Sequence, residues 1–238
     1  MKKVYYWLIG STLLTAFPSH TKEFASLSDF SVGVQGGYGF GRSNVQRRET
    51  YTFPGYQNKM DKSSLASEGI IGGLFVEYNH VLENSFFYGL SLNYILSKAS
   101  GKFRTEINAG YPVSTSIKSK HSYSAAVRFG KVLNEYSPYL LIGVVTSYKK
   151  SVTDQLPATG SGSYSKYLPG IQFGGGVDFN ISQTVSVGTE ISRIIYKKFS
   201  YDLKNNAHTK VAAISIKPRE SRAMLRLRFK LGNPFQEP

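Results

Sequence analysis

Two-residue alternation of apolar side chains with small or polar ones returns eight times along this chain, and it limits the possible folds more than any other feature. Successive side chains of a β-strand point to opposite faces, so this period predicts strands with one apolar face. The eight segments are Ser31–Gly41, Glu68–Val81, Phe86–Ser97, His121–Val132, Pro138–Tyr148, Leu168–Ile181, Val185–Tyr196 and Ser221–Leu231. The pattern therefore predicts an all-β protein of eight strands.

The last segment distinguishes a barrel in lipid from a soluble sandwich. Its cations, Arg226, Arg228 and Lys230, alternate with large apolar residues. Three cations in the dry core of a sandwich would be prohibitively costly, whereas the polar interior of a membrane barrel can pair them with acids. The segments are 11 to 14 residues long, near the length that a tilted strand needs to cross hydrocarbon. Abundant Tyr (17), Phe (15) and Gly (23) also favour a transmembrane β-barrel.

The links between the segments alternate in length. The long links are Arg42–Ser67, Lys98–Lys120, Lys149–Tyr167 and Lys197–Glu220, and the short ones are Leu82–Ser85, Leu133–Ser137 and Ser182–Thr184. Outer-membrane barrels have long external loops and short periplasmic turns. This rhythm predicts an antiparallel up-and-down barrel with four long external loops and three short periplasmic turns.

The N-terminus has the features of an export signal. Lys2 and Lys3 precede an apolar stretch from Val4 to Phe17, which is too short for a transmembrane helix but fits the core of a signal peptide. We expect residues 1–22 to be a signal peptide, with cleavage between Phe17 and Ser26, and residues 23–238 to form the barrel. The chain has no cysteine, which excludes a disulfide scaffold and a thiolate metal site.

Several segments carry a family resemblance. Pro138–Val144 (PYLLIGV), Gly174–Ile181 (GGGVDFNI) and Val185–Ile191 (VSVGTEI) resemble the small OmpA/OmpX-type outer-membrane β-barrels, and the resemblance extends from Phe30 to Leu231. It implies a bacterial outer-membrane location and a role as adhesin, structural anchor or surface antigen. The chain departs from these barrels at its end, where it continues past Phe229 to Pro238 instead of stopping at an aromatic residue.

Strand parity places a set of charged residues inside the barrel. The set is Glu77, Arg128, Asp178, Glu190, Arg226, Arg228 and Lys230, four bases and three acids. We expect Glu190 to face Arg128 and the cations of the last strand. An eight-stranded barrel is only wide enough for its own side chains, so these charges form either a salt-bridged plug or a narrow ion path.

The long links carry most of the net charge of +14. The candidate external basic residues are Arg42, Arg47, Arg48, Arg104, Lys149, Lys150, Lys197, Lys198 and Lys204. Expected partners are outer-membrane lipid and the phosphates of lipopolysaccharide near the strand ends, and anionic host-surface polymers or proteins at the loop tips. No nucleic acid is expected for an exported protein.

The sequence offers little to catalysis. His80, His121 and His208 lack a partner at catalytic spacing, and no metal site or phosphate-binding loop is present, so no cofactor is expected. The sequence thus predicts a non-enzymatic surface protein, envelope-structural and adhesin-like through its basic loops. The alternative is a narrow porin that passes small solutes or ions.

Overall fold

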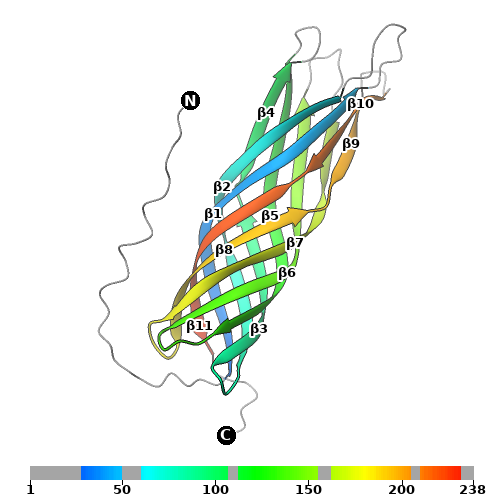
Figure 1. Ribbon diagram of the computed structural model, residues 1–238. Coiled ribbons are helices and arrows are strands. Elements are labelled where there is room, and N and C mark those ends of the chain that lie inside the picture. The colour runs from blue at the N-terminus through cyan, green and yellow to red at the C-terminus, as the bar shows by residue number, and fades with distance from the viewer. Residues whose placement is uncertain (1–27, 50–59, 107–111, 155–161, 205–209, 232–238) are drawn as a thin grey trace, which may run out of the picture.

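The computed structural model describes residues 28–49, 60–106, 112–154, 162–204 and 210–231, and shows a tall, closed barrel of tilted strands (Figure 1). Its strands are β1 (Ser28–Glu49), β2 (Met60–Val81), β3 (Phe86–Ser97), β4 (Ser100–Glu106), β5 (Pro112–Lys131), β6 (Tyr136–Asp154), β7 (Gly162–Asn180), β8 (Val185–Tyr196), β9 (Phe199–Lys204), β10 (Lys210–Lys217) and β11 (Arg219–Lys230). Within these ranges no helix is long and apolar enough to cross a membrane.

The strands close into an antiparallel ring of eight positions. β1 pairs with β2 on one side and with β11 on the other, which joins the two ends of the sheet. Three positions are each shared by two consecutive strands: β3 with β4, β8 with β9, and β10 with β11. Pro218, which has no N–H to donate, separates β10 from β11. This ring agrees with the eight strands expected from the sequence.

Three tight turns join strands at one end of the barrel. They lie between β2 and β3, between β5 and β6, and between β7 and β8, at the lower end in Figure 1. Ser85 and Asn134 in two of these turns have φ values of 65° and 52°, as reversals of this kind require. The connections at the other end, residues 50–59, 107–111, 155–161 and 205–209, lie outside the described residues.

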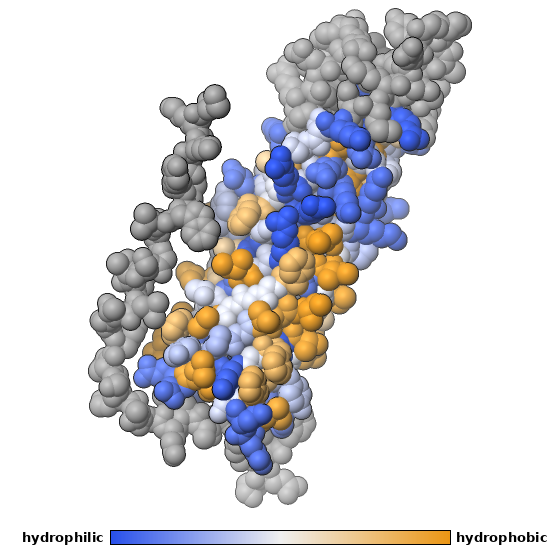
Figure 2. Space-filling view, in the orientation of Figure 1, coloured by the Kyte–Doolittle hydropathy of each residue, from blue (hydrophilic) through white to orange (hydrophobic). Residues whose placement is uncertain are grey.

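The half of the barrel nearest the tight turns has an apolar outer surface. Ile70, Leu140, Ile142 and Leu225 are each at least 63 % exposed, and Figure 2 shows such residues as an orange band. The alternate positions point inward; many of them are polar, such as the fully buried Ser31, and others, such as Ile71 and Leu141, are apolar. This arrangement suits a wall that faces hydrocarbon and an interior that holds polar groups.

The strands continue beyond the apolar band, but there the inward face is apolar and the outward face is polar. Leu65 and Ile216 now point inward and are 1 % and 0 % exposed, while Arg48 and Lys62 point outward. The long links predicted from the sequence are therefore wrong in their bounds, because much of each link is a continuation of a strand. The same two-residue period persists there, with the apolar face turned inward because water replaces lipid outside.

The outer part of the barrel is filled by its own apolar core. This outer core consists of Val45, Leu65, Ile117, Val145, Leu168, Ile194, Tyr196, Phe199, Leu203, Ile214 and Ile216, with Tyr164 and Tyr201 packed against it. β7 and β9 contact each other without a ladder between these two described strands: the rings of Tyr164 and Phe199 stack with centroids 4.3 Å apart. β9 is held by its ladder with β10.

The continuation of β2 beyond the band can be tested with one pair of variants. Leu65→Ala removes a buried side chain from the outer core and should lower the free energy of unfolding by about 3 kcal/mol. Ser64→Ala, at an adjacent exposed position, should change it by less than about 0.5 kcal/mol. Urea unfolding in detergent, followed by circular dichroism, measures both. Equal, small effects would mean that residues 60–67 are a loop.

Candidate functional site

Six of the predicted interior residues meet in one inner charge cluster, within the part of the barrel that carries the apolar band. They come from five strands: Glu77 (β2), Arg128 (β5), Asp178 (β7), Glu190 (β8), and Arg226 and Arg228 (β11). All six are at most 6 % exposed, and Arg128 is fully buried. Each alternates along its strand with a residue on the outer surface, which explains why parity places them inside.

Glu77 is at the centre of the cluster. Its carboxylate oxygens lie 2.6 Å from Nη1 of Arg128, 2.5 Å from Nη2 of Arg226 and 2.8 Å from Nη2 of Arg228. Ser91 donates a further hydrogen bond of 2.8 Å. One fully buried carboxylate therefore joins three guanidinium groups from two strands that are far apart in the sequence.

Asp178 and Glu190 complete the charge balance. Asp178 Oδ2 lies 2.6 Å from both Arg128 and Arg228, and Glu190 Oε2 lies 3.1 Å from Arg226. The inner charge cluster thus holds three guanidinium groups and three carboxylates, which sum to zero charge. An ion pair for every charge lowers the cost of burying the six groups, although Nε of each arginine has no hydrogen-bond partner.

Two aromatic residues that sequence reasoning missed also belong to this cluster. The Tyr139 hydroxyl donates to Glu190 at 3.1 Å and accepts from Arg226 at 3.1 Å. The Arg128 guanidinium lies 3.7 Å from the centre of the Tyr139 ring, and that of Arg226 lies 4.0 Å from the centre of the Phe75 ring. Their signal was available, since Phe75 shares the inward parity of Glu77, and Tyr139 shares that of Gly143 and Ser147.

The structure corrects two expected contacts. Lys230 lies apart from the cluster, with its Nζ 3.8 Å from Asp29 Oδ2, so three bases rather than four face the three acids. Arg128 forms its ion pairs with Glu77 and Asp178, and the described contacts include none with Glu190. Strand parity gives the face on which a side chain lies but not its position along the barrel axis, and that position decides which charges form ion pairs.

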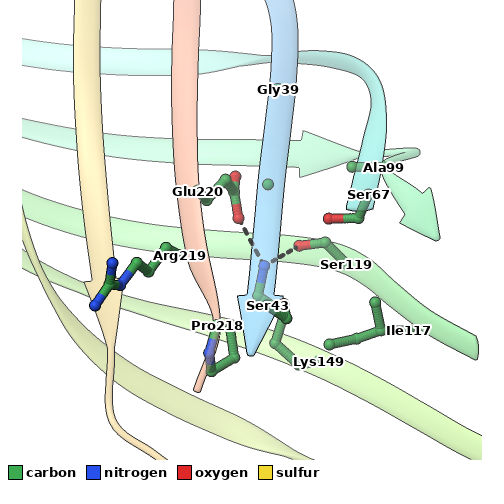
Figure 3. Close-up of a pocket in the computed structure, with 11 residues that line it drawn as sticks. Gly39, Ser43, Ser67, Ala99, Ile117, Ser119, Lys149, Pro218, Arg219 and Glu220 are labelled. Carbon is green, nitrogen blue, oxygen red and sulfur yellow. Dashed lines mark hydrogen bonds and ion pairs between the residues drawn. The ribbon is translucent and has the colours of Figure 1, made fainter. Parts of the chain in front are cut away.

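A second group, the outer charge cluster, lies next to the outer core, on the side of the apolar band. It consists of the charged side chains of Lys149, Glu220 and Arg222 and the hydroxyl of Tyr196, whose ring belongs to the outer core. Lys149 Nζ lies 2.6 Å from Glu220 and donates to Ser119 at 3.0 Å, as Figure 3 shows. Arg222 Nε lies 2.8 Å from the other oxygen of Glu220. A cavity of about 10 Å³ beside Lys149 and Glu220 is close to the room that one water molecule needs.

Sequence reasoning missed the outer charge cluster. It placed Lys149 and Glu220 in loops and did not single out Arg222, whereas Lys149 is 6 % exposed and points into the barrel. The signal was the two-residue row of the last strand: Glu220 and Arg222 share the parity of Arg226 and Arg228. The prediction that Lys149 is an external residue is wrong.

Between the two clusters the interior is packed with side chains. Ile71, Ile95 and Met224 form a small apolar group there, and Gln35 donates to Asn93 at 3.2 Å. Along the barrel axis the order is therefore the inner charge cluster, this apolar group, the outer charge cluster and the outer core. The described side chains fill the barrel, as expected for one of this width.

The structure separates the predicted external basic residues into three groups. The exposed ones are Arg42 and Arg48 on β1, Lys150 on β6, and Lys197 and Lys198 between β8 and β9. Arg47 is 8 % exposed and shares the inward parity of Val45, so its placement at a loop tip is wrong. Arg104 and Lys204 are located by their backbone alone, in β4 and β9.

No catalytic arrangement emerges around the described histidines. His121 Nε2 lies 2.9 Å from the Tyr167 hydroxyl, and the His80 ring lies beside that of Tyr88 at 5.2 Å. Across the described ranges no group of three or more His, Cys, Asp or Glu side chains could hold a metal ion. His208 and the expected signal peptide, residues 1–22, lie outside the described residues.

The central role of Glu77 leads to a prediction. Glu77→Ala leaves three guanidinium groups facing two carboxylates, and should lower the free energy of unfolding by about 3–5 kcal/mol. Glu190→Ala should lower the free energy of unfolding by less, because Arg226 keeps its ion pair with Glu77. The single Trp of the chain is Trp7, so unfolding is followed by circular dichroism or by gel mobility without heating. Equal costs for the two variants would contradict a cluster centred on Glu77.

Solved structures similar to this chain are outer-membrane barrels. OprG of Pseudomonas aeruginosa has a TM-score of 0.51 at 10 % identity, with 86 % of this chain and 97 % of that chain covered. The protease OmpT of Escherichia coli has a TM-score of 0.50 at 8 % identity, with coverages of 85 % and 97 %. Ail of Yersinia pestis, in complex with the heparin analogue sucrose octasulfate, reaches 0.32 at 14 % identity, with 83 % and 99 % covered. At these identities the likeness concerns the fold.

The curated protein sequences contain no match to this chain. The profile described as "Outer membrane protein beta-barrel domain" matches residues 9–229, nearly the whole chain. Its match agrees with the closed ring, the apolar outer band and the polar interior. The chain belongs to this outer-membrane β-barrel family and is a protein of the bacterial outer membrane.

Proposed function

We propose that this protein is a closed, non-enzymatic surface barrel whose outer end binds anionic polymers. The observation that carries the proposal is the charge of the strand continuations beyond the apolar band. From the outer edge of the band onward, the exposed cations are Arg42, Arg48, Lys62, Lys98, Lys102, Lys118, Lys120, Lys150, Lys166, Lys197, Lys198, Lys217 and Arg219. Among the described side chains of that region, the exposed carboxylates are Glu68 and Asp202.

The length of β1 supports a location of part of this charge beyond the lipid headgroups. Arg48 lies eight residues after Phe40, a residue of the apolar band. At about 3.4 Å per residue this is roughly 27 Å along a tilted strand. Exposed charges are screened over about 8 Å at physiological salt, so Arg48 and its neighbour Lys62 gain little from lipid phosphates. A soluble or cell-bound polyanion is the partner that such positions can reach.

The nature of this surface predicts a salt-dependent loss of binding. Arg48→Ala/Lys62→Ala should reduce retention on immobilised heparin at low salt, and the difference from the unaltered protein should shrink as salt rises. Thermal unfolding should stay unchanged, because both side chains are exposed.

Two controls sharpen the experiment. Arg48→Lys/Lys62→Arg keeps both charges and should keep retention, whereas Asn44→Ala/Gln46→Ala alters uncharged neighbours on the same exposed face and should have no effect. Unchanged retention of the alanine variant at low salt would rule out polymer binding by these strands.

The alternative function is a narrow porin, in which the inward charges would line an ion path. Ions could pass only if the inner charge cluster opened, and its ion pairs of 2.5 to 3.1 Å support a closed barrel instead. We expect no steady single-channel current when the refolded protein is inserted into planar bilayers. A stable conductance that changes in the Glu77→Gln variant would mean that the barrel is a pore and would contradict the proposed closed barrel.

A further inference from the structure

The cavity beside the outer charge cluster is bordered by small residues. Two glycines at inward positions of β1 and three serines line it: Gly39, Gly41, Ser43, Ser67 and Ser119. Arg219 also borders the cavity, but its side chain points away, so the charged groups there are the Lys149 ammonium and the Glu220 carboxylate (Figure 3). Glycine at two successive inward positions therefore leaves a space against these charged groups.

The outer charge cluster carries more positive than negative charge. Lys149 and Arg222 both form an ion pair with Glu220, and the described ion pairs give neither cation a second carboxylate. Glu190 also acts on the charge of Arg222, but it already forms an ion pair with Arg226 in the inner charge cluster. The inner cluster sums to zero, whereas the outer one keeps one positive charge. A buried charge without a counter-charge is costly.

A further cation lies opposite Lys149. Lys166 of β7 is its direct partner across the ladder with β6, and it shares the inward parity of Leu168 although its side chain is exposed. Like charges that lie directly opposite each other destabilise a sheet. The described ion pairs include no acid for Lys166, so this second lysine adds to the excess of positive charge.

Hydrogen-bond donors are also left over at the cavity. The Lys149 ammonium has three N–H donors and donates to Glu220 and Ser119, so the third has no described acceptor. Ser43 lines the cavity and is only 2 % exposed, and neither its hydroxyl nor that of Ser67 makes a described hydrogen bond. Arg222 Nη1 is buried without a partner. Spare donors and excess positive charge both call for an acceptor with a negative charge.

The size of the cavity restricts that acceptor. Its volume of about 10 Å³ is close to the room that one water molecule needs. A halide ion is only slightly larger than water, whereas phosphate, sulfate and carboxylate groups need more room. A water molecule would accept the spare hydrogen bonds but leave the charge of the cluster unbalanced. A halide ion does both.

We propose that this cavity is a binding site for one monovalent anion of halide size, such as chloride. The anion accepts hydrogen bonds from the Lys149 ammonium and from the hydroxyl groups of Ser43 and Ser67, and it balances the outer charge cluster. It thereby joins β1, β2 and β6 at the base of the outer core. The site goes beyond the proposed polymer binding, because it lies inside the barrel and uses other residues.

The first test measures stability of the full-length refolded protein in a non-ionic detergent. Sodium chloride replaces sodium gluconate, whose anion is too large for the cavity, at constant ionic strength, so that screening is equal in both solutions. Chloride at about ten times its dissociation constant should multiply the ratio of folded to unfolded protein about elevenfold. Urea unfolding followed by circular dichroism measures this as a higher midpoint.

Three variants connect this response to the cavity. Lys149→Met removes the excess charge and should abolish the chloride response. Gly39→Ala keeps every charge but adds a methyl group 3.3 Å from Ile71 Cγ2 and 3.8 Å from a carboxylate oxygen of Glu220, so it should weaken the response by narrowing the cavity. The matched control is Gly36→Ala, an outward position on the same strand with its nearest atom at 4.0 Å, and it should respond as the unaltered protein does.

The second test locates the ion directly. Crystals soaked in sodium bromide should give an anomalous peak within hydrogen-bond distance of Lys149 Nζ and Ser43 Oγ. A water molecule there without a bromide peak, equal stability in chloride and gluconate, or a full chloride response in Gly39→Ala would each overturn the proposal. A bromide peak without stabilisation at about 0.15 M chloride would mean binding at crystal concentration only and would also overturn it.

Because Gly39→Ala does not depend on the folding of the Lys149→Met variant, the proposal stays testable if that variant fails to fold. Retention of Gly39→Ala on heparin should equal that of the unaltered protein, since the substitution leaves the exposed cations in place. A loss of the chloride response with unchanged retention therefore separates this site from the polymer surface.

Discussion

Every peptide group in hydrocarbon must find its hydrogen-bond partner within the protein, and the rest of this structure depends on that constraint. It is met by the pairing of β1 with both β2 and β11, which leaves no open sheet edge at the level of the apolar band. Closure also creates the site, because Glu77 on β2 reaches Arg226 on β11, 149 residues away, only across a closed ring. The inner charge cluster in turn fills and fixes the narrow interior.

The strands also cross from one solvent into another, and their sequences follow that change. Within the band, Phe40 faces outward at 50 % exposure, while inward Gln35 is buried. Beyond the band, Val45 faces inward and Arg48 outward. The outer part is thus organised like a small water-soluble barrel, with the outer core as its interior, and it continues directly from the membrane part through the same ladders.

Much of the fold could be predicted from the sequence, because β3 and β8 lie within the apolar band and show one uninterrupted pattern. Their bounds, Phe86–Ser97 and Val185–Tyr196, agree with the expected ones. β1, β2, β5, β6 and β7 were underestimated where the alternation inverts, since an inward apolar row with an outward charged row resembles a polar loop.

The candidate site was predictable in part for the same reason. Parity identified six members of the inner charge cluster, but Lys149 and Lys150 differ in face by a single position. Assigning them requires the strand to be known past Tyr148. On β5 the bulge between Ser119 and Ser122 adds one residue and so shifts the parity. The alternation after the bulge therefore does not predict which residues before the bulge point inward. Partners such as Asp29 for Lys230 depend on height in the barrel, which sequence spacing does not give.

The continuation of paired strands beyond the band has a consequence for how the surface of this protein can diverge. A surface carried on loops tolerates substitution at every residue, whereas a surface carried on strands tolerates it at every second one. On β1, Arg42, Asn44, Gln46 and Arg48 are exposed, while the intervening Ser43, Val45 and Arg47 are buried. Relatives whose exposed surface has diverged should therefore differ with a period of two residues along these strands, and their outer core should stay constant beneath a changing exterior.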